Sequence, residues 1–258
     1  MNKENASKLW KIFYKIINKF FMNNTGDELL NLLNIKEKII FDVGCYRGNF
    51  TKNIINHEAK KINNSNYYLF DPNPNVQNYL KELLGNENVK YFQLALDNTN
   101  MKKKFTINRY FEASGSSLKS AHREDQLYNL SRKAFMKLFQ PFKKIQDYEE
   151  INVQTQTIDN FCLLNNIERI DLLKLDTDGT EHEVFLGAEK LLSQGKIGLI
   201  YTEISGFKKK FDYKVEKIVK LLNKYNFELK KVYSIPSFSI FSNLKSTDNL
   251  FINKSVNN

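Results

Sequence analysis

Apolar runs and amphipathic segments alternate along most of this chain. The runs are rich in β-branched and aromatic residues, which predicts buried strands, and the segments between them repeat apolar residues at helical spacing. The predicted strands are 38–43, 66–71, 88–96, 102–108, 151–157, 170–176, 196–204, 227–235 and 249–254. The predicted helices are 49–62, 72–85, 158–166, 180–195 and 213–226. This alternation favours an α/β fold with a doubly wound, mainly parallel sheet, in which 102–108 pairs antiparallel with 88–96.

The N-terminal part of the chain carries a different pattern. Residues 8–21 repeat apolar positions at three- and four-residue spacing with lysines between them, which predicts an amphipathic basic helix, and 25–33 predict a second short helix. The basic helix packs on its own domain, the commoner arrangement, or contacts an anionic surface such as a membrane. We therefore expect an N-terminal helical extension, 1–36, before a main domain, 37–258.

A polar, basic segment interrupts the alternation of strands and helices. Residues 111–150 predict an insertion with a helical middle that Pro141 ends or kinks. An insertion after a central strand of such a sheet is well placed to cover a ligand site. Surface decoration explains the same pattern, and both interpretations stay open.

Composition narrows the class of protein. The net charge is +10, which favours acidic partners such as nucleic acid or an anionic lipid or glycan, although a lysine-rich surface alone accounts for it. The only cysteines, Cys45 and Cys162, and three histidines exclude a disulfide framework and a structural zinc site. No apolar run reaches the roughly 18 residues of a membrane-spanning helix, and the N-terminus lacks a signal-peptide pattern, so we expect a cytoplasmic protein.

The first predicted strand of the main domain ends in a carboxylate and is followed by a glycine loop. Asp42, Gly44 and Gly48 form a D-x-G-x-x-x-G pattern, whose glycines let backbone N–H groups approach a ligand. Tyr46 breaks the G-x-G-x-x-G pattern of a dinucleotide site. A carboxylate suits the ammonium group in the amino-acid part of a sulfonium cofactor, although Asp42 could also cap a helix.

The next two strands end in similar chemistry. Asp71 follows the second strand and is placed to accept hydrogen bonds from ribose hydroxyls. Ala95, Leu96 and Asp97 end the third strand, where an adenine could stack and be recognised at its edge. Each acidic residue could be an ordinary turn residue, but their occurrence at successive strand ends favours a ligand with a nucleoside part and an amino-acid part.

A cluster of charged residues follows in "IDLLKLDTDGTEHEVFLGA" and "LIYTE". The candidate catalytic residues are Lys174, Asp176, Asp178, Glu181 and Glu203. Such carboxylates could act as a general base, or Asp176, Asp178 and Glu203 could hold a divalent ion such as Mg²⁺. Simpler roles are helix capping by Asp178 and an ion pair between Lys174 and Asp176.

These motifs together resemble a known family. "FDVGCYRGNFT", "LFDPNP", "LALDN", "INVQTQTIDNF", "IDLLKLDTDGTEHEVFLGAEKLL" and "LIYTE" occur in the order found in the FkbM family of methyltransferases, over residues 39–204. The resemblance implies a class I methyltransferase with a Rossmann-like fold and S-adenosylmethionine as methyl donor. It also implies O-methylation, often of a sugar or of a hydroxyl on a natural product.

The resemblance also assigns residues. Asp42, Gly44, Gly48 and Asp71 match the cofactor positions, and Lys174, Asp176, Gly179 and Glu181 match the signature block. Together with the strand-end residues, the expected cofactor site comprises Asp42, Gly44, Cys45, Tyr46, Gly48, Thr51, Asp71, Pro72, Asn73, Ala95, Leu96 and Asp97. Two departures stand out: Cys45 and Tyr46 replace the family's usual Ala-Asn, and Asp178 replaces its usual Glu.

The resulting hypothesis is methyl transfer to an alcohol oxygen of a small-molecule or glycan acceptor. A base such as Asp176, Glu181 or Glu203, or a bound Mg²⁺, would help to remove the proton, with His122 and His182 as weaker candidates. The alternatives are an RNA methyltransferase and a non-catalytic module that binds membranes or glycans. A nicotinamide-dependent oxidoreductase is disfavoured because G-x-G-x-x-G is missing.

Overall fold

The computed structural model describes part of the 258-residue chain. It covers Leu29, Leu32 and residues 37–58, 65–108, 116–118, 148–235 and 244–255. Apart from those two leucines, the expected N-terminal extension, including the basic helix at 8–21, lies outside the described residues. Most of the expected insertion, with His122 and Pro141, also lies outside them.

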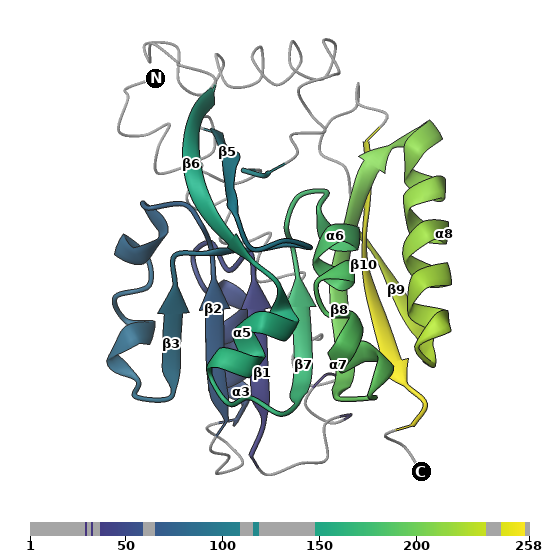
Figure 1. Ribbon diagram of the computed structural model, residues 1–258, viewed down its shortest axis with the longest axis horizontal. Helices are drawn as coiled ribbons and strands as arrows, with labels where there is room; N and C mark the ends of the chain where they lie inside the picture. The colour runs from purple at the N-terminus through teal and green to yellow at the C-terminus, as the bar shows by residue number, and fades with distance from the viewer. Residues whose placement is uncertain are drawn as a thin grey trace, which may run out of the picture.

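A seven-stranded sheet forms the centre of the molecule (Figure 1), in the order β3-β2-β1-β7-β8-β10-β9. The strands are β1 (Ile39–Val43), β2 (Asn66–Phe70), β3 (Val89–Phe92), β7 (Ile170–Leu175), β8 (Ile197–Phe207), β9 (Phe227–Ile235) and β10 (Leu244–Asn253). Each neighbouring pair among β3, β2, β1, β7 and β8 is parallel. Strand β10 runs antiparallel to both of its neighbours, β8 and β9. The predicted α/β class with a mainly parallel sheet is therefore confirmed.

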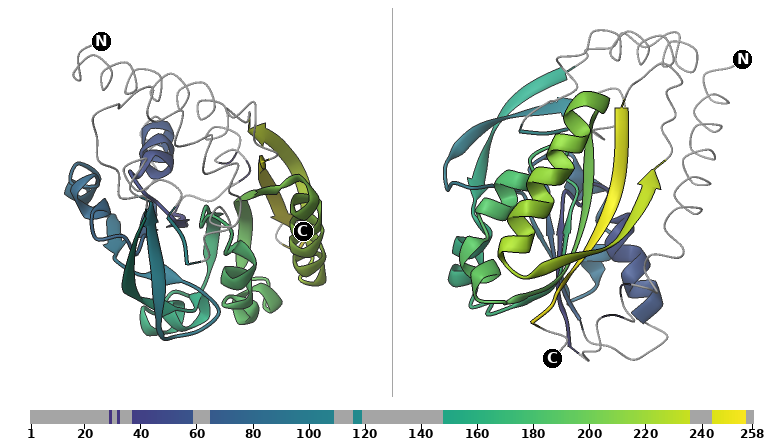
Figure 2. Two further views of the ribbon diagram at one scale, coloured as in Figure 1. Left: turned by 90° about the horizontal axis from the view of Figure 1, so that it is seen from above. Right: turned by 90° about the vertical axis from the view of Figure 1, so that its right-hand side faces the viewer.

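Helices cover both faces of this sheet (Figure 2). On one face lies α3 (Asn49–Glu58). The other face is covered by α5 (Ile158–Leu164), α6 (Glu181–Leu186), α7 (Glu189–Ser193) and α8 (Lys208–Lys224). None of the helices within the described ranges is long and apolar enough to cross a membrane.

The period of two along each strand decides which side chains meet which helices. Phe41 and Leu173 point to the core that contains α5 to α8, whereas Ile40 and Leu172 point to the core that contains α3. Asp42 and Lys174 have the parity of Ile40 and Leu172. They therefore lie on the α3 side, at the carboxyl ends of their strands.

A second, three-stranded sheet extends beyond the carboxyl ends of β1 and β2 (Figure 1). It consists of β4 (Ala95–Leu96), β6 (Tyr148–Gln156) and β5 (Lys102–Asn108), in that order. Strand β5 is antiparallel to β6, so the predicted pairing of 102–108 with 88–96 was wrong. Strand β6 also begins inside the range expected for the insertion.

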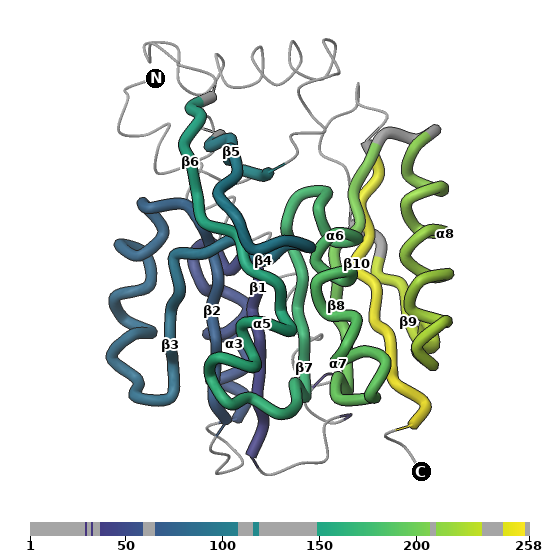
Figure 3. Tube along the Cα trace, in the orientation of Figure 1, coloured from purple at the N-terminus to yellow at the C-terminus, as the bar shows by residue number. Residues whose placement is uncertain are grey.

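The predicted strand 88–96 is divided between the two sheets. Strand β3 ends at Phe92, and β4 then pairs parallel with β6 (Figure 3). The physical reason is a tight turn, in which the N–H of Leu94 donates to the carbonyl of Phe92 over 2.8 Å. The sequence had suggested that Ala95 and Leu96 end a strand of the main sheet. They form β4 of the second sheet instead.

The segment 72–85 forms two short 3₁₀ turns, Val76–Asn78 and Leu83–Gly85, in place of the predicted helix. Side chains capture the backbone donors at its start. Asn73 N–H donates to Asp71, and Asn75 N–H donates to the side chain of Asn73, each over 3.0 Å. Such local bonds compete with helix formation.

The predicted helix 180–195 is interrupted between α6 and α7 at Gly187. A Cβ atom on Gly187 would lie 2.1 Å from the carbonyl oxygen of Asp97. This glycine therefore allows the helix pair to pack directly on the segment after β4.

Candidate active site

The loop between β1 and α3 is held in a conformation that requires special backbone angles. Gly44, Tyr46 and Gly48 all have positive φ, at 71°, 46° and 68°. Such angles are unfavourable for a residue with a side chain, so Tyr46 is strained. The N–H groups of Gly44 and Cys45 both donate to the carbonyl of Phe70, at 2.9 and 3.1 Å, which fixes the loop to the end of β2.

This loop also contacts the segment that follows β7. A Cβ atom on Gly44 would lie 1.8 Å from the carbonyl oxygen of Asp176. In addition, Asp176 N–H donates to the carbonyl of Val43 over 3.0 Å. The glycine loop and the signature segment therefore form one continuous surface at the carboxyl ends of β1 and β7.

Asp42 lies beneath that surface. Its carboxylate is fully buried, and it accepts a hydrogen bond from Thr51 Oγ1 at 2.8 Å. Its other oxygen lies 3.0 Å from Lys174 Nζ. The structure thus gives Asp42 an ammonium partner from the protein, whereas the sequence had suggested an ammonium from a ligand.

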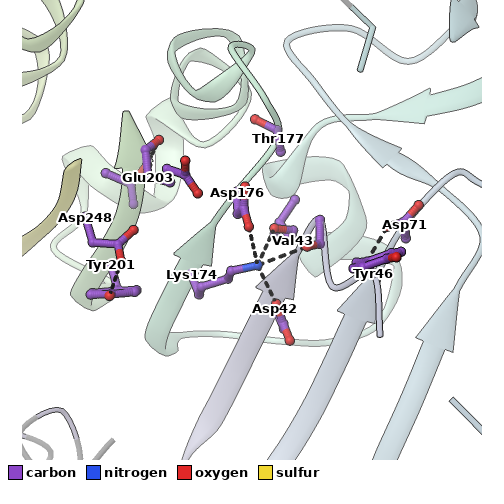
Figure 4. Close-up of polar contacts among 12 residues, drawn as sticks. Asp42, Val43, Tyr46, Asp71, Lys174, Asp176, Thr177, Tyr201, Glu203 and Asp248 are labelled. Carbon is purple, nitrogen blue, oxygen red and sulfur yellow. Dashed lines mark hydrogen bonds and ion pairs between the residues drawn. The ribbon is translucent and has the colours of Figure 1, made fainter. Parts of the chain in front are cut away.

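Asp71 follows β2 and holds the loop from the other side (Figure 4). One carboxylate oxygen accepts from Tyr46 N–H at 3.1 Å, and the other accepts from Asn73 N–H at 3.0 Å. Burial raises the pKa of Asp71 to about 6, against the lowering effect of these two hydrogen bonds. Because each carboxylate oxygen can accept more than one hydrogen bond, Asp71 keeps the capacity to bind a pair of hydroxyl groups.

The other expected cofactor residues lie in mixed positions. Pro72 and Asn73 are buried directly beside Asp71. Ala95 and Leu96 lie in β4, and Leu96 is part of the core under α5. Asp97 is buried and forms an ion pair with Lys103, so its carboxylate has a partner within the protein.

Carboxylates from neighbouring strands lie beside one another next to Lys174 (Figure 4). Asp176 follows β7 and is 45 % exposed. Glu203 lies on β8, one position beyond the last residue that pairs with β7, and accepts from Ser246 Oγ. Asp248 lies on β10 directly opposite Glu203 and accepts from Tyr201 at 2.7 Å. The sequence predicted that Glu203 ends its strand, but β8 continues to Phe207. Glu203 does lie beside Asp176.

The close approach of Asp176, Glu203 and Asp248 favours protonation of at least one of these three carboxylates. Burial and the charges of Asp176 and Asp248 raise the pKa of Glu203 well above its usual value. Partial loss of solvation raises the pKa of Asp176, although its side chain is 45 % exposed, and the charge of Lys174 opposes this effect. Burial also raises the pKa of Asp248 to about 6, while the bond from Tyr201 lowers it. Asp176 is the member closest to Lys174 and is the carboxylate best placed to keep its charge.

Glu181 has a different environment. It is buried, and one carboxylate oxygen accepts from Thr177 N–H at 3.1 Å, from the Thr177 hydroxyl at 2.9 Å and from Gly179 N–H at 3.0 Å. Asp178 lies within the same turn, with a positive φ of 55°. Glu181 therefore shapes this turn, and its carboxylate is committed to the backbone, which makes it a poor candidate for a base.

No metal site is supported. Among the residues that the structure covers, no three or more His, Cys, Asp or Glu side chains are arranged to hold a metal ion. The expected Mg²⁺ set of Asp176, Asp178 and Glu203 is therefore not supported by the geometry. His182 lies within α6.

Sequence reasoning missed Asp248, Tyr201 and Ser246. The predicted strand 249–254 was too short, since β10 begins at Leu244 and includes Asp248. The position of β10 between β8 and β9 brings Asp248 opposite Glu203, and that order cannot be read from the chain alone. Asp248 lies in a polar run, 245–249, so the sequence offered no periodic signal for it.

A family model described as the methyltransferase FkbM domain matches residues 42–229, and the chain belongs to this family. The protein is therefore an S-adenosylmethionine-dependent methyltransferase. The non-catalytic alternative is therefore set aside. The chain is also 25 % identical, over 180 residues, to the 2-O-methyltransferase NoeI of Sinorhizobium fredii (strain NBRC 101917 / NGR234). This alignment covers 69 % of this chain and 68 % of that protein.

Two solved structures show a distant likeness to this chain. A methyltransferase FkbM from Methylobacillus flagellatus KT aligns with a TM-score of 0.47 and 11 % identity, over 84 % of this chain and 43 % of that longer chain. The magnesium protoporphyrin IX methyltransferase ChlM from Synechocystis PCC 6803, solved with bound SAM, aligns with a TM-score of 0.48 and 11 % identity, over 93 % and 82 % of the two chains. At these scores the likeness adds no argument to the family match.

Proposed function

We propose that this enzyme transfers the methyl group of S-adenosylmethionine to a hydroxyl oxygen of a sugar, a glycan or a glycosylated natural product. The observation that carries the proposal is the pair of neighbouring carboxylates, Asp176 and Glu203, of which Asp176 adjoins the glycine loop at Gly44. The name of its relative NoeI, a 2-O-methyltransferase, supports oxygen as the methylated atom.

The residues present fit the cofactor. Asp71 has acceptor capacity for the two ribose hydroxyls, and the backbone of the loop from Gly44 to Gly48 would face the methionine part. The N–H groups of Cys45 and Tyr46 already donate to Phe70 and Asp71, so these two residues would contribute by shaping the loop. We propose no direct contact for Asp97, because Lys103 occupies its carboxylate. When bound, S-adenosylmethionine supplies a methyl group on a positively charged sulfur.

The protein's part in the reaction is to orient the acceptor and remove a proton. We assign the role of base to Asp176, because Lys174 favours its charged form, and the role of a protonated neighbour to Glu203. Asp176 would accept the O–H proton of the acceptor as that oxygen takes the methyl group. The electron pair of the methyl–sulfur bond would stay on the sulfur, so the by-product would be S-adenosylhomocysteine.

The test uses purified protein, S-adenosylmethionine with a labelled methyl group, and a panel of sugars and oligosaccharides. We expect label on a hydroxyl oxygen of at least one sugar, and a loss of about 10²–10⁴-fold in kcat for Asp176→Asn. Asp212→Asn removes an exposed carboxylate on α8 and serves as the matched control with unchanged rate. Full activity of Asp176→Asn would refute the assigned base.

A further inference from the structure

Lys174 is enclosed by acceptors on the protein. Its side chain is buried on β7, and its ammonium nitrogen lies 3.0 Å from a carboxylate oxygen of Asp42 and 3.0 Å from the carbonyl of Gly44. The carbonyl of Val43 lies at 3.4 Å. The two carbonyls accept hydrogen bonds from the ammonium group, and the Asp42 carboxylate forms an ion pair with it.

The remaining surroundings leave little room for a substrate. The ring of Phe50, from α3, lies 6.0 Å from the ammonium nitrogen. Asp176 lies 3.7 Å from it and is the one neighbour at that nitrogen with a largely exposed side chain among the residues that the structure describes. Lys174 can therefore influence the reaction through Asp176 and the loop, but it is poorly placed to donate to an acceptor hydroxyl.

Two backbone contacts next to Lys174 connect the glycine loop to the segment after β7. The N–H of Asp176 donates to Val43, and Gly44 packs directly on the carbonyl of Asp176. Lys174 bonds to the carbonyls of the same two residues, Val43 and Gly44. The lysine and the backbone thus join the start of the glycine loop to the segment that carries Asp176.

We propose that Lys174 is a positioning residue, which fixes the glycine loop relative to Asp176 and so sets the distance between the cofactor and the base. Its effect on cofactor affinity follows from its bonds to Val43 and Gly44. Its effect on Asp176 rests on the proposed function, in which Asp176 is the base.

A simpler role must be distinguished from this one. Lys174 also neutralises the buried charge of Asp42, and removal of one member of a buried ion pair destabilises a protein strongly. A loss of activity in a Lys174 variant alone would therefore not separate positioning from stability. The double variant Lys174→Met/Asp42→Asn removes both charges and leaves the carbonyls of Val43 and Gly44 without their side-chain donor.

The chain offers a matched control. Lys38 and Glu58 form another buried ion pair, with 3.2 Å between Nζ and Oε1. Lys38 precedes β1, at the end of that strand opposite Asp42. Lys38→Met/Glu58→Gln removes a comparable buried pair far from the loop.

The experiment measures two quantities for each variant: the free energy of unfolding in urea, and the Kd of S-adenosylmethionine and S-adenosylhomocysteine by calorimetry. We expect the double variant at Lys174 and Asp42 to recover stability relative to Lys174→Met. We also expect its cofactor affinity to remain at least about tenfold weaker than that of the wild type, or about 1.4 kcal/mol. The control pair should keep the wild-type affinity.

Several results would overturn the proposal. Recovery of affinity together with stability in the double variant would reduce Lys174 to charge neutralisation. Wild-type affinity in Lys174→Met, or an equal loss of affinity in the control pair, would also exclude positioning. If Lys174→Met does not fold, the double variant and the control still decide. Because binding is measured without an acceptor, failure of the proposed sugar chemistry leaves this result unaffected.

Discussion

Buried carboxylates give the site its chemistry, and Asp71 shows what burial does to one of them. Its pKa rises from an ordinary 3.8 to about 6, so the charged form is less favourable in the folded protein than in the unfolded chain. The hydrogen bonds from Tyr46 and Asn73 keep the group in place for a ligand with hydroxyl donors. The buried charge of Asp71 therefore lowers the stability of the folded protein, while its oxygens remain able to bind the hydroxyl groups of a ligand.

The variant Asp71→Asn should separate these effects. Well below pH 3.8 the carboxyl is neutral in both the folded and the unfolded state, and it has no effect on pH dependence. As the pH rises from about 4 to about 6, the wild type loses stability and the variant does not. The amide can accept from only one of the two backbone N–H groups, so the test is the change with pH: the stability of the variant relative to the wild type should rise by about 1–3 kcal/mol between pH 3 and pH 8. Urea unfolding across this range measures the difference, and calorimetry should show weaker binding of S-adenosylmethionine. A stability difference that stays constant across this range would contradict this account.

Asp248 supplies a second test at the residue scale. Its negative charge raises the pKa of Glu203, so Asp248→Asn should lower that pKa. Because the proposed function requires Glu203 to be protonated, the basic limb of the activity profile should therefore move to lower pH in the variant. The pH dependence of kcat measures this, with Asp212→Asn as an exposed control. An unchanged basic limb would show that Glu203 and Asp248 do not titrate together with the reaction.

At the scale of elements, the close contact of the glycine loop with the segment after β7 sets the geometry. Strands β1 and β7 could be predicted, because their runs of apolar residues are typical of buried parallel strands. The turns in 72–85 could not, because Asp71 and Asn73 bind backbone donors that a helix needs. The break at Gly187 depends on Asp97, which is distant in sequence.

Gly44→Ala tests this contact. The added Cβ would lie 1.8 Å from a backbone oxygen, and the residue has a φ of 71°, so we expect a loss of at least about 2 kcal/mol of stability together with weaker cofactor binding. Gly85→Ala is the control, because no atom lies within 4 Å of its added Cβ, and its change should be within about 0.5 kcal/mol. Urea unfolding compares the two. Equal, small changes would show that the loop can move away from Asp176.

At the scale of the whole molecule, the fold class followed from the alternation of strands and helices, whereas the full site did not. Asp42, Asp71 and Asp176 could be found because each one ends or follows an apolar run. Asp248 could not, because its place opposite Glu203 depends on the insertion of β10 between β8 and β9. The lysine that the sequence offered as a catalyst is instead enclosed by Asp42 and the loop carbonyls.

The charge of the site also bears on the alternative of an RNA acceptor. The chain as a whole carries a net charge of +10, but Asp176, Glu203 and Asp248 gather at the place proposed for the acceptor. Carboxylates repel phosphate, so we expect no labelled methyl group in RNA, and no inhibition of sugar methylation by added RNA at moderate salt. Methyl transfer to RNA that weakens steeply with salt would reverse this conclusion.

The most direct test of the central claim is to locate the transferred methyl group. The enzyme would be incubated with S-adenosylmethionine carrying a ¹³C-labelled methyl group and a sugar panel, and the products would be analysed by NMR and mass spectrometry. We predict one ¹³C-methyl group on a sugar hydroxyl oxygen, formed about 10²–10⁴-fold more slowly when Asp176→Asn replaces the wild type under the same conditions. Label on nitrogen, on carbon or on RNA, with the sugars unchanged, would contradict the proposed function.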